Sequence, residues 1–233
     1  MSEIQAVILA AGLGTRLGRP LPKPLTRLED GRSILQQQVD NLRAAFGPKV
    51  RITAVAGFKA TLIMEEQPDL LYAYNPYFDD TNTSKSLLRA LITSAHGGGL
   101  WLNGDVVFDA GVLDDLADAI RAERSTVCVN TEAVGDEEVK YTVDAFGCIR
   151  ELSKTVVGGL GEAVGINYVA VQDKPVLIEE LRRCADGDYF ERGLETAVQD
   201  RGMRLHPLDI SHRFAVEVDF EEDLTRANHR EMV

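Results

Sequence analysis

Residues 9–25, LAAGLGTRLGRPLPKPL, join the end of an apolar segment to a loop rich in glycine and positive charge. The continuous apolar run over residues 4–11 is typical of a strand buried on both faces of a parallel sheet. Glycines follow at positions 12, 14 and 18, with the cations Arg16, Arg19, Lys23 and Arg27. No acidic residue occurs between Ile4 and Leu28, although the chain carries a formal net charge of −12. Because glycines let backbone N–H groups approach phosphate oxygens and cations neutralise them, the segment predicts an anion-binding turn.

Two common phosphate-binding loops do not fit this spacing. A P-loop needs GxxxxGK followed by Ser or Thr, whereas Lys23 is followed by Pro24. The dinucleotide-binding fingerprint needs GxGxxG, whereas Gly12, Gly14 and Gly18 are spaced GxGxxxG. The alternative is a flexible loop with solvated charges. That interpretation does not explain why a buried strand, three glycines and four cations without any acid occur together.

Short apolar runs alternate with amphipathic segments along most of the chain, which predicts an α/β fold with a mainly parallel central sheet. Six to eight strands are expected, from segments 4–11, 50–56, 70–74, 100–103, 126–130, 163–171, 204–208 and 214–218. Helices are expected over 33–46, 59–66, 83–96, 111–121, 173–185 and 188–200 and from about 220, with Ser33 and Asn82 as N-caps. Segments 139–143 and 148–152 flank the turn DAFG and predict a small antiparallel hairpin.

The bulk composition excludes several classes of protein. The 233 residues are 45% hydrophobic and 27% charged, as in an ordinary globular protein. The acidic net charge argues against nucleic acid or an anionic membrane as a partner. No apolar run is long enough to span a bilayer, and Glu3 stands where a secretory signal carries a basic residue, so we expect a cytoplasmic protein. Three cysteines without CxxC spacing predict buried, reduced thiols.

The chain resembles the nucleoside-triphosphate transferases that make NDP-sugars and CDP-alcohols. LAAGxGTRL followed by PKPL carries the resemblance, and later segments match in order: VAGF (55–58), NTSKSL (82–87), NGD (103–105), GEAVGINYV (161–169) and VEVDFEEDL (216–224). The resemblance implies a Rossmann-like nucleotidyltransferase fold, a mixed and mainly parallel sheet flanked by helices. The sequence has no internal repeat, low-complexity segment or linker, so we expect one domain over residues 1–233, with a nucleotide-binding half to about residue 130 and an acceptor-binding half from 131 to 233. A homodimer is left open.

Two acidic positions are candidate magnesium ligands. Asp105 follows Asn103-Gly104 at the end of an apolar strand, where α/β sheets bind ligands. The resemblance implies that Asp105 and Asp219 hold Mg²⁺, with Glu217, on the same strand face as Asp219, in support. As structural alternatives, Asp105 would cap the next turn, and Asp219 would N-cap a helix with Glu222 as its capping-box partner.

Lys23, Arg16 and Asp105 are the candidate catalytic residues. The prolines on both sides of Lys23 restrict its backbone, which suits a fixed charge beside transferring phosphates, and Arg16 is expected at the β- and γ-phosphates. We expect Lys23 and Asp105 to hold one triphosphate from opposite sides, and Arg19 and Arg27 to be rim or surface charges. The resemblance implies these nucleotide-binding residues: Leu9, Ala10, Ala11, Gly12, Gly14, Thr15, Arg16, Lys23, Gly57, Asn82, Thr83, Ser86 and Gly104. Asn82 and Ser86 have a competing interpretation as helix-cap residues.

The acceptor is expected beyond residue 130, at Lys154, Glu162, Tyr189 and Glu191. Tyr189-Phe190-Glu191 begins a helix and is the strongest candidate, whereas a solvated lysine is an alternative for Lys154. Tyr141 and Tyr168 are aromatic-wall candidates that the core would also accommodate.

The expected function is Mg²⁺-dependent transfer of a nucleoside monophosphate from an NTP to a small phosphorylated alcohol, phosphonate or sugar phosphate, with release of pyrophosphate. The NxxxSL arrangement at 82–87 looks more like cytidylyltransferases acting on phosphocholine, aminoethylphosphonate or inositol phosphate, so CTP is favoured. The alternatives are a sugar-1-phosphate nucleotidyltransferase using UTP, dTTP or GTP, a catalytically silent nucleotide-binding regulatory module, and a glycosyltransferase of similar architecture.

Overall fold

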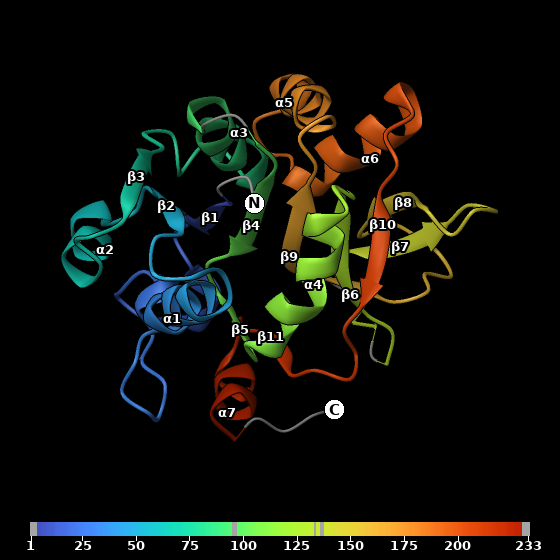
Figure 1. Ribbon diagram of the computed structural model, residues 1–233. Coiled ribbons are helices and arrows are strands. Elements are labelled where there is room, and N and C mark those ends of the chain that lie inside the picture. Colours follow the sequence, from blue (N-terminus) through green and yellow to red (C-terminus); the bar gives the residue numbers. More distant parts are fainter. Residues whose placement is uncertain (1–3, 95–96, 133, 136–137, 230–233) are drawn as a thin grey trace.

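The computed structural model describes residues 4–94, 97–132, 134–135 and 138–229, and it shows one large sheet with helices on both faces (Figure 1). The main path of the sheet has the order β10-β6-β9-β4-β1-β2-β3. Its strands are β1 (Gln5–Ala10), β2 (Arg51–Ala56), β3 (Leu71–Tyr74), β4 (Gly99–Asn103), β6 (Thr126–Asn130), β9 (Glu162–Val169) and β10 (His206–Asp209). Neighbours pair in parallel except at β9, which runs antiparallel to both β4 and β6. The expected mixed, mainly parallel sheet is confirmed.

Two antiparallel additions complete the strands. β7 (Lys140–Val143) and β8 (Ile149–Ser153) form the expected hairpin, which joins the sheet at β9. β5 (Val106–Phe108) pairs with β11 (Ala215–Glu217) in a separate two-stranded sheet. The described residues therefore contain eleven strands. Ten of them match segments named from the sequence, β5 is additional, and the total of six to eight was too low. β5 was missed because its three residues follow NGD directly and are too short to show a period.

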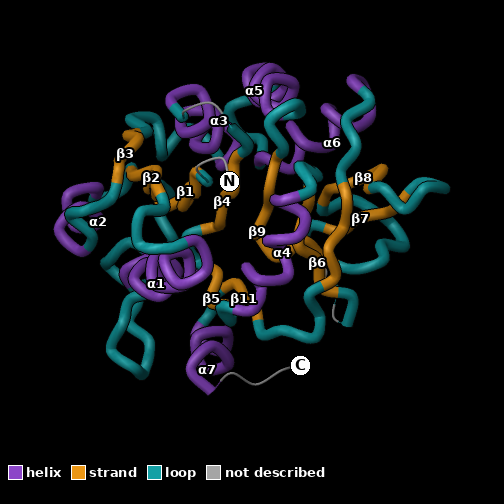
Figure 2. Tube along the Cα trace, viewed as in Figure 1, coloured by secondary structure: helices purple, strands orange, loops and turns teal. Residues whose placement is uncertain are grey.

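Helices cover the sheet as the amphipathic segments predicted. They are α1 (Ile34–Phe46), α2 (Ala60–Glu66), α3 (Thr83–Thr93), α4 (Gly111–Arg121), α5 (Lys174–Arg183), α6 (Phe190–Arg201) and α7 (Glu221–His229). In Figure 2, α3, α5 and α6 lie along the top of the view and α7 at the bottom, with the strands between them. None of the helices in the described ranges is long and apolar enough for a membrane span.

The predicted N-caps are in place. The Ser33 hydroxyl accepts the backbone N–H of Gln36 at 3.0 Å, and Asn82 accepts that of Thr83 at 2.8 Å. α3 ends at Thr93 and is shorter than expected, because Ser94 has an extended backbone; residues 95–96 lie outside the described part.

β1 lies between the two halves of the core, because alternate side chains of a strand face opposite sides. Ala6, Ile8 and Ala10 pack in one apolar cluster with α1, α2 and α4. Val7 and Leu9 pack in a second cluster with α3, α5, α6 and the hairpin. Burial on both faces explains the apolar sequence of β1 from Ala6 to Ala10 and fixes the position at which the glycine-rich loop leaves the sheet.

Candidate active site

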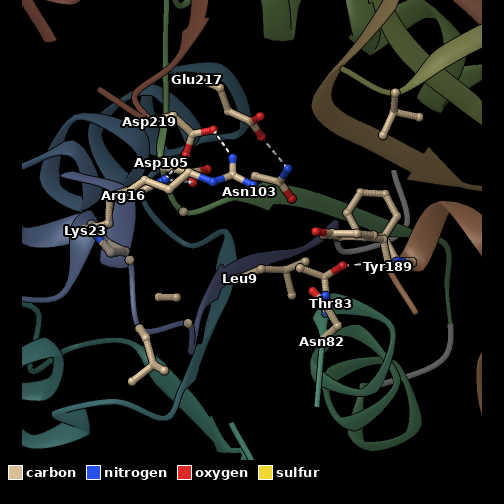
Figure 3. Close-up of a pocket in the computed structure, with 18 of the residues that line it drawn as sticks. Leu9, Arg16, Lys23, Asn82, Thr83, Asn103, Asp105, Tyr189, Glu217 and Asp219 are labelled. Carbon is tan, nitrogen blue, oxygen red and sulfur yellow. Dashed lines mark hydrogen bonds and ion pairs between the residues drawn. The ribbon is translucent and has the colours of Figure 1, made fainter. Parts of the chain in front are cut away.

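A cavity of about 410 Å³ lies where the loop after β1 meets the turn after β4 (Figure 3). Its remaining walls come from the start of α3, the hairpin region, the start of α6 and the end of β11. The carboxyl ends of parallel strands are where open α/β sheets bind ligands. Nearly all the sequence motifs that we singled out therefore reach one cavity.

The turn that carries Asp105 is packed tightly against β1. The N–H of Gly104 donates to the carbonyl of Leu9 at 3.0 Å, and a Cβ on Gly104 would lie 2.5 Å from that oxygen. The Gln38 side chain, buried in α1, donates to the carbonyls of Asn103 and Val106, both at 2.8 Å. Asp105 thus lies in a turn that hydrogen bonds from both β1 and α1 hold in place.

The end of β11 brings Asp219 to the same place. The N–H of Val218 donates to the carbonyl of Asp105 at 3.0 Å. The structural alternative, in which Asp219 N-caps the last helix with Glu222 as its partner, is wrong: Asp223 accepts the N–H groups of Asp219 and Phe220, at 3.1 and 2.8 Å. This leaves the carboxylate of Asp219 free to face the cavity.

The backbone at Lys23 is held in a fixed position. This residue starts a short 3₁₀ turn, Lys23–Leu25, and its side chain is 9% exposed. Gly14 packs against it with φ +62°, and a Cβ there would lie 2.9 Å from Lys23 Cβ. A side chain at position 14 would therefore be strained by the backbone and would displace the lysine.

The cations of the loop and the two aspartates form one ionic cluster. The ammonium of Lys23 donates to Asp105 Oδ2 at 2.8 Å and also to Asp219 Oδ1. Arg16 Nη1 donates to Asp219 Oδ2 at 2.6 Å. Burial alone would lower the pKa of Lys23, but the two carboxylates outweigh it and the pKa is raised. Burial would raise the pKa of Asp219, but Lys23 and Arg16 lower it below its ordinary value, so both groups are charged.

The oxygen donors of this cluster suit Mg²⁺. Asp105 and Asp219 converge on one cation, the Lys23 ammonium, and carboxylate oxygens are the ligands that Mg²⁺ prefers. Within the described ranges, no three His, Cys, Asp or Glu residues are arranged to hold a metal. Mg²⁺ is commonly bound by one or two carboxylates together with substrate phosphates, and the two aspartates provide that number.

Glu217 has different surroundings from the two aspartates. It accepts the amide of Asn103 at 2.7 Å (Figure 3). Burial, and then the charge of Asp105, raise its pKa well above the ordinary range. Glu138, which also lines the cavity, has a raised pKa because of burial and then the charge of Glu162.

The far end of the cavity is built by α3 and α6 together. The Thr83 hydroxyl accepts the N–H of Phe190 at 3.1 Å, and the N–H of Asn82 donates to the carbonyl of Asp186 at 2.7 Å. The Lys154 ammonium lies 5.1 Å from the centroid of the Tyr189 ring, within the range of a cation–π contact. The start of α3 and the start of α6 therefore form a single wall.

Glu191 is a buried acid of the cavity with an unsatisfied side-chain oxygen. Its side chain is buried, with 8% exposure, and no described residue makes a hydrogen bond with Oε2. Burial raises the pKa of Glu191 to about 7. A buried acceptor without a partner is a group that a ligand can satisfy.

The cavity gathers most of the residues singled out in the sequence: Leu9, Ala10, Gly12, Gly14, Arg16, Lys23, Asn82, Thr83, Gly104, Asp105, Lys154, Tyr189, Glu191, Glu217 and Asp219. Arg19 and Arg27 lie outside it in exposed ion pairs with Glu221 and Glu66, as expected for surface charges. The side chain of Thr15 lies outside what the structure describes.

Four candidate residues do not line this cavity. Ser86 is buried and accepts the amide of Asn75 at 3.1 Å, and Ala11 is buried with its carbonyl bonded to the N–H of Phe58. A Cβ on Gly57 would lie 2.7 Å from that Ala11 oxygen, so Gly57 packs directly against the backbone at the start of the loop. Glu162 lines a neighbouring cavity of about 490 Å³ and accepts the N–H of Gly135 at 3.0 Å.

The aromatic-wall prediction is wrong for Tyr141 and Tyr168. Both rings are buried in the core, with 4% and 3% exposure. Tyr141 on β7 and Tyr168 on β9 both occupy strand positions that face the core.

Two residues of the site were missed as individual candidates. Asn103 lines the cavity and donates to Glu217, and Glu138 lies between the two cavities. Asn103 had a detectable signal, a polar side chain at the end of a buried strand beside Asp105. Glu138 precedes the hairpin in a segment without periodicity, and the sequence carries no signal for it.

Comparison with known proteins shows the family of the chain. Residues 6–213 match the MobA-like NTP transferase domain. The CMP-5′-(3-aminopropyl)phosphonate synthase of Streptomyces rubellomurinus is 30% identical over 97% of this chain, and the UTP–glucose-1-phosphate uridylyltransferase AglF of Haloferax volcanii is 31% identical over 66% of it. The chain spans 38% and 64% of the lengths of these two proteins.

Two solved structures have the same fold. The inositol-1-phosphate CTP transferase from T. maritima superposes with a TM-score of 0.78 at 16% identity, covering 100% of this chain and 99% of the other. The CTP:phosphocholine cytidylyltransferase LicC from Streptococcus pneumoniae gives 0.77 at 17% identity, covering 98% and 99%. The expected nucleotidyltransferase fold is thus confirmed, and the chain belongs to the MobA-like NTP transferase domain family.

Proposed function

We propose that this protein is a Mg²⁺-dependent nucleotidyltransferase that transfers the nucleoside monophosphate of an NTP, with CTP favoured, to a small phosphorylated acceptor. One observation carries the proposal. Arg16 and Lys23 meet Asp105 and Asp219 at one end of a cavity whose other end is lined by the last residues of β1 and by the start of α3. This arrangement offers cations for phosphates and carboxylates for a metal within reach of one nucleotide.

The loop residues bind and orient the triphosphate. Lys23 and Arg16 neutralise phosphate oxygens, and Gly12 and Gly14 let backbone groups approach them. The base would bind at the opposite end of the cavity from the ionic cluster, where the lining residues are Leu9, Ala10, Asn82 and Thr83. Asp105 and Asp219 would hold Mg²⁺, with Glu217 as a third acid beside them; the metal, when bound, neutralises and orients the phosphate chain.

The chemical step needs no protein nucleophile. An oxygen of the acceptor phosphate attacks the α-phosphorus in line, the bond from that phosphorus to the α–β bridging oxygen breaks, and pyrophosphate leaves with the electron pair. The residues contribute positioning and electrostatic stabilisation, which are the main sources of catalysis in phosphoryl transfer. Lys154, near the Tyr189 ring, is suited to the acceptor phosphate, and Tyr189 and Glu191 to the rest of the acceptor.

The choice of nucleotide and acceptor draws on the names of similar proteins. The Streptomyces rubellomurinus relative is named for a CMP-phosphonate product, and both structural neighbours are named for CTP. The Haloferax volcanii relative, named for UTP and glucose 1-phosphate, supports the alternative of a sugar-1-phosphate nucleotidyltransferase. We therefore favour CTP with a phosphonate or alcohol phosphate as acceptor.

Pyrophosphate release tests this proposal. The purified protein is incubated with MgCl₂, one of CTP, UTP, dTTP or GTP, and one of 3-aminopropylphosphonate, phosphocholine, inositol 1-phosphate or glucose 1-phosphate. We expect release above background with CTP and at least one of the first three acceptors. Binding of Mg·CTP without turnover on any acceptor would favour a catalytically silent regulatory module instead.

Variants of the ionic cluster test its role. Lys23→Ala and Asp105→Ala should each lower turnover by about 100-fold or more, because each removes a charge that faces the reacting phosphates. Arg27→Ala is the matched control: it removes a cation of the same loop whose exposed ion pair with Glu66 contributes little. Near-normal turnover in both cluster variants, with unchanged thermal unfolding, would contradict the proposed site.

A further inference from the structure

In the structure, the side chains suited to phosphates are paired with the side chains suited to the metal. Lys23 bridges Asp105 and Asp219, and Arg16 bonds the other oxygen of Asp219. We propose that the Lys23 ammonium is a place-holder cation, which occupies the point between Asp105 and Asp219 and excludes a free divalent cation until a triphosphate draws it away. This inference rests on the proposed function and concerns the order in which nucleotide and metal are bound.

The local structure allows the ammonium to move while the residue stays in place. The 3₁₀ turn, the neighbouring prolines and the contact with Gly14 fix the Lys23 backbone. The side chain beyond Cβ is a flexible four-carbon stem that ends in a compact point charge. Lys23 can therefore exchange carboxylate partners for phosphate oxygens by changing rotamers, without a loop movement.

Burial makes this exchange dependent on the nucleotide. The Lys23 side chain is 9% exposed, so displacement by a metal ion alone would leave its ammonium buried without a partner, which is strongly unfavourable. A triphosphate supplies a new partner as the carboxylates are released. Arg16 is 49% exposed and can turn to solvent, so it imposes no comparable barrier.

The exchange couples the two ligands thermodynamically. A triphosphate that binds Lys23 frees both carboxylates, and a cation that binds the carboxylates frees Lys23. By linkage, the factor by which either ligand strengthens the other is the same in both directions. A divalent cation alone is then a poor ligand of the free protein.

Metal binding without nucleotide tests the inference directly. Mn²⁺ titrations, followed by calorimetry and by the electron paramagnetic resonance signal of the free ion, compare the unaltered protein with Lys23→Met. Lys154→Met is the matched control, because it removes one lysine charge from the same cavity without touching Asp105 or Asp219. Lys23→Gln, which keeps a polar group on the stem, serves if Lys23→Met does not fold.

We expect Lys23→Met or Lys23→Gln to bind Mn²⁺ at least about ten-fold more tightly than the unaltered protein, since a charge-assisted competitor has been removed. Lys154→Met should stay within about two-fold of the unaltered protein, as expected for a mostly screened charge. Equal Mn²⁺ affinity with and without Lys23, an equal gain in Lys154→Met, or no Mn²⁺ binding by either Lys23 variant would each overturn the inference. The titration uses neither nucleotide nor turnover, so its failure is distinguishable from failure of the proposed reaction.

Discussion

Replacing Glu191 with glutamine is expected to change how the stability of the protein depends on pH. The carboxyl is buried, Oε2 has no partner among the described residues, and burial raises the pKa from 4.5 to about 7. Since one pH unit of pKa difference is worth about 1.4 kcal/mol, ionised Glu191 lowers the unfolding free energy at pH 8 by about 3 kcal/mol.

The direction of the pH dependence follows from proton binding. Between the unfolded pKa and the folded pKa, the native protein binds more protons at Glu191 than the unfolded chain does. Stability from this group is therefore fully present below pH 4.5 and is lost as the pH rises to about 7. Glutamine cannot ionise, so Glu191→Gln lacks this loss.

Urea unfolding at a series of pH values from 5 to 8 measures the effect. At each pH, the unfolding free energy of Glu191→Gln is subtracted from that of the unaltered protein. This difference should fall by about 2 kcal/mol between pH 5 and pH 8. Glu222→Gln, at an exposed position of α7, controls for removal of one negative charge. Parallel pH profiles for the unaltered protein and Glu191→Gln would refute the assignment of Glu191 as a buried group that ionises near neutral pH.

Two further substitutions test the packing of Gly57 against the loop and the role of Lys154 on the acceptor side. Gly57→Ala should lower the unfolding free energy in urea by about 1–3 kcal/mol, because its Cβ would lie 2.7 Å from the Ala11 carbonyl and 2.5 Å from Phe78 Cβ; a change below about 0.5 kcal/mol would contradict this packing. Lys154→Met should raise the KM for the acceptor while leaving the KM for the nucleotide nearly unchanged in steady-state pyrophosphate release. An equal rise in both constants would remove Lys154 from the acceptor side.

The main elements of the fold were predictable because burial leaves a period in the sequence. The apolar run of β1 and the caps at Ser33 and Asn82 depend on local chemistry, and the structure places them within a residue or two of expectation. β5 was not predictable, since three residues carry no period and its partner β11 lies more than a hundred residues away.

The site was predictable to the extent that its chemistry is local. Glycines and cations in one loop, and carboxylates near strand ends, mark Lys23, Asp105 and Asp219. The supports of the site depend on contacts between distant segments, such as the buried amide of Gln38 at the Asp105 turn and the Asp223 carboxylate at the end of β11. A glutamine within a helical segment gives no indication of which carbonyl it will bind.

A crystal structure with CTP and MgCl₂, without acceptor, would show whether one nucleotide contacts both the loop cations and the two aspartates. We expect a triphosphate in contact with the Lys23 ammonium and with a metal ion held by Asp105 and Asp219. A triphosphate bound elsewhere, or bound while Lys23 still bridges both aspartates, would contradict it.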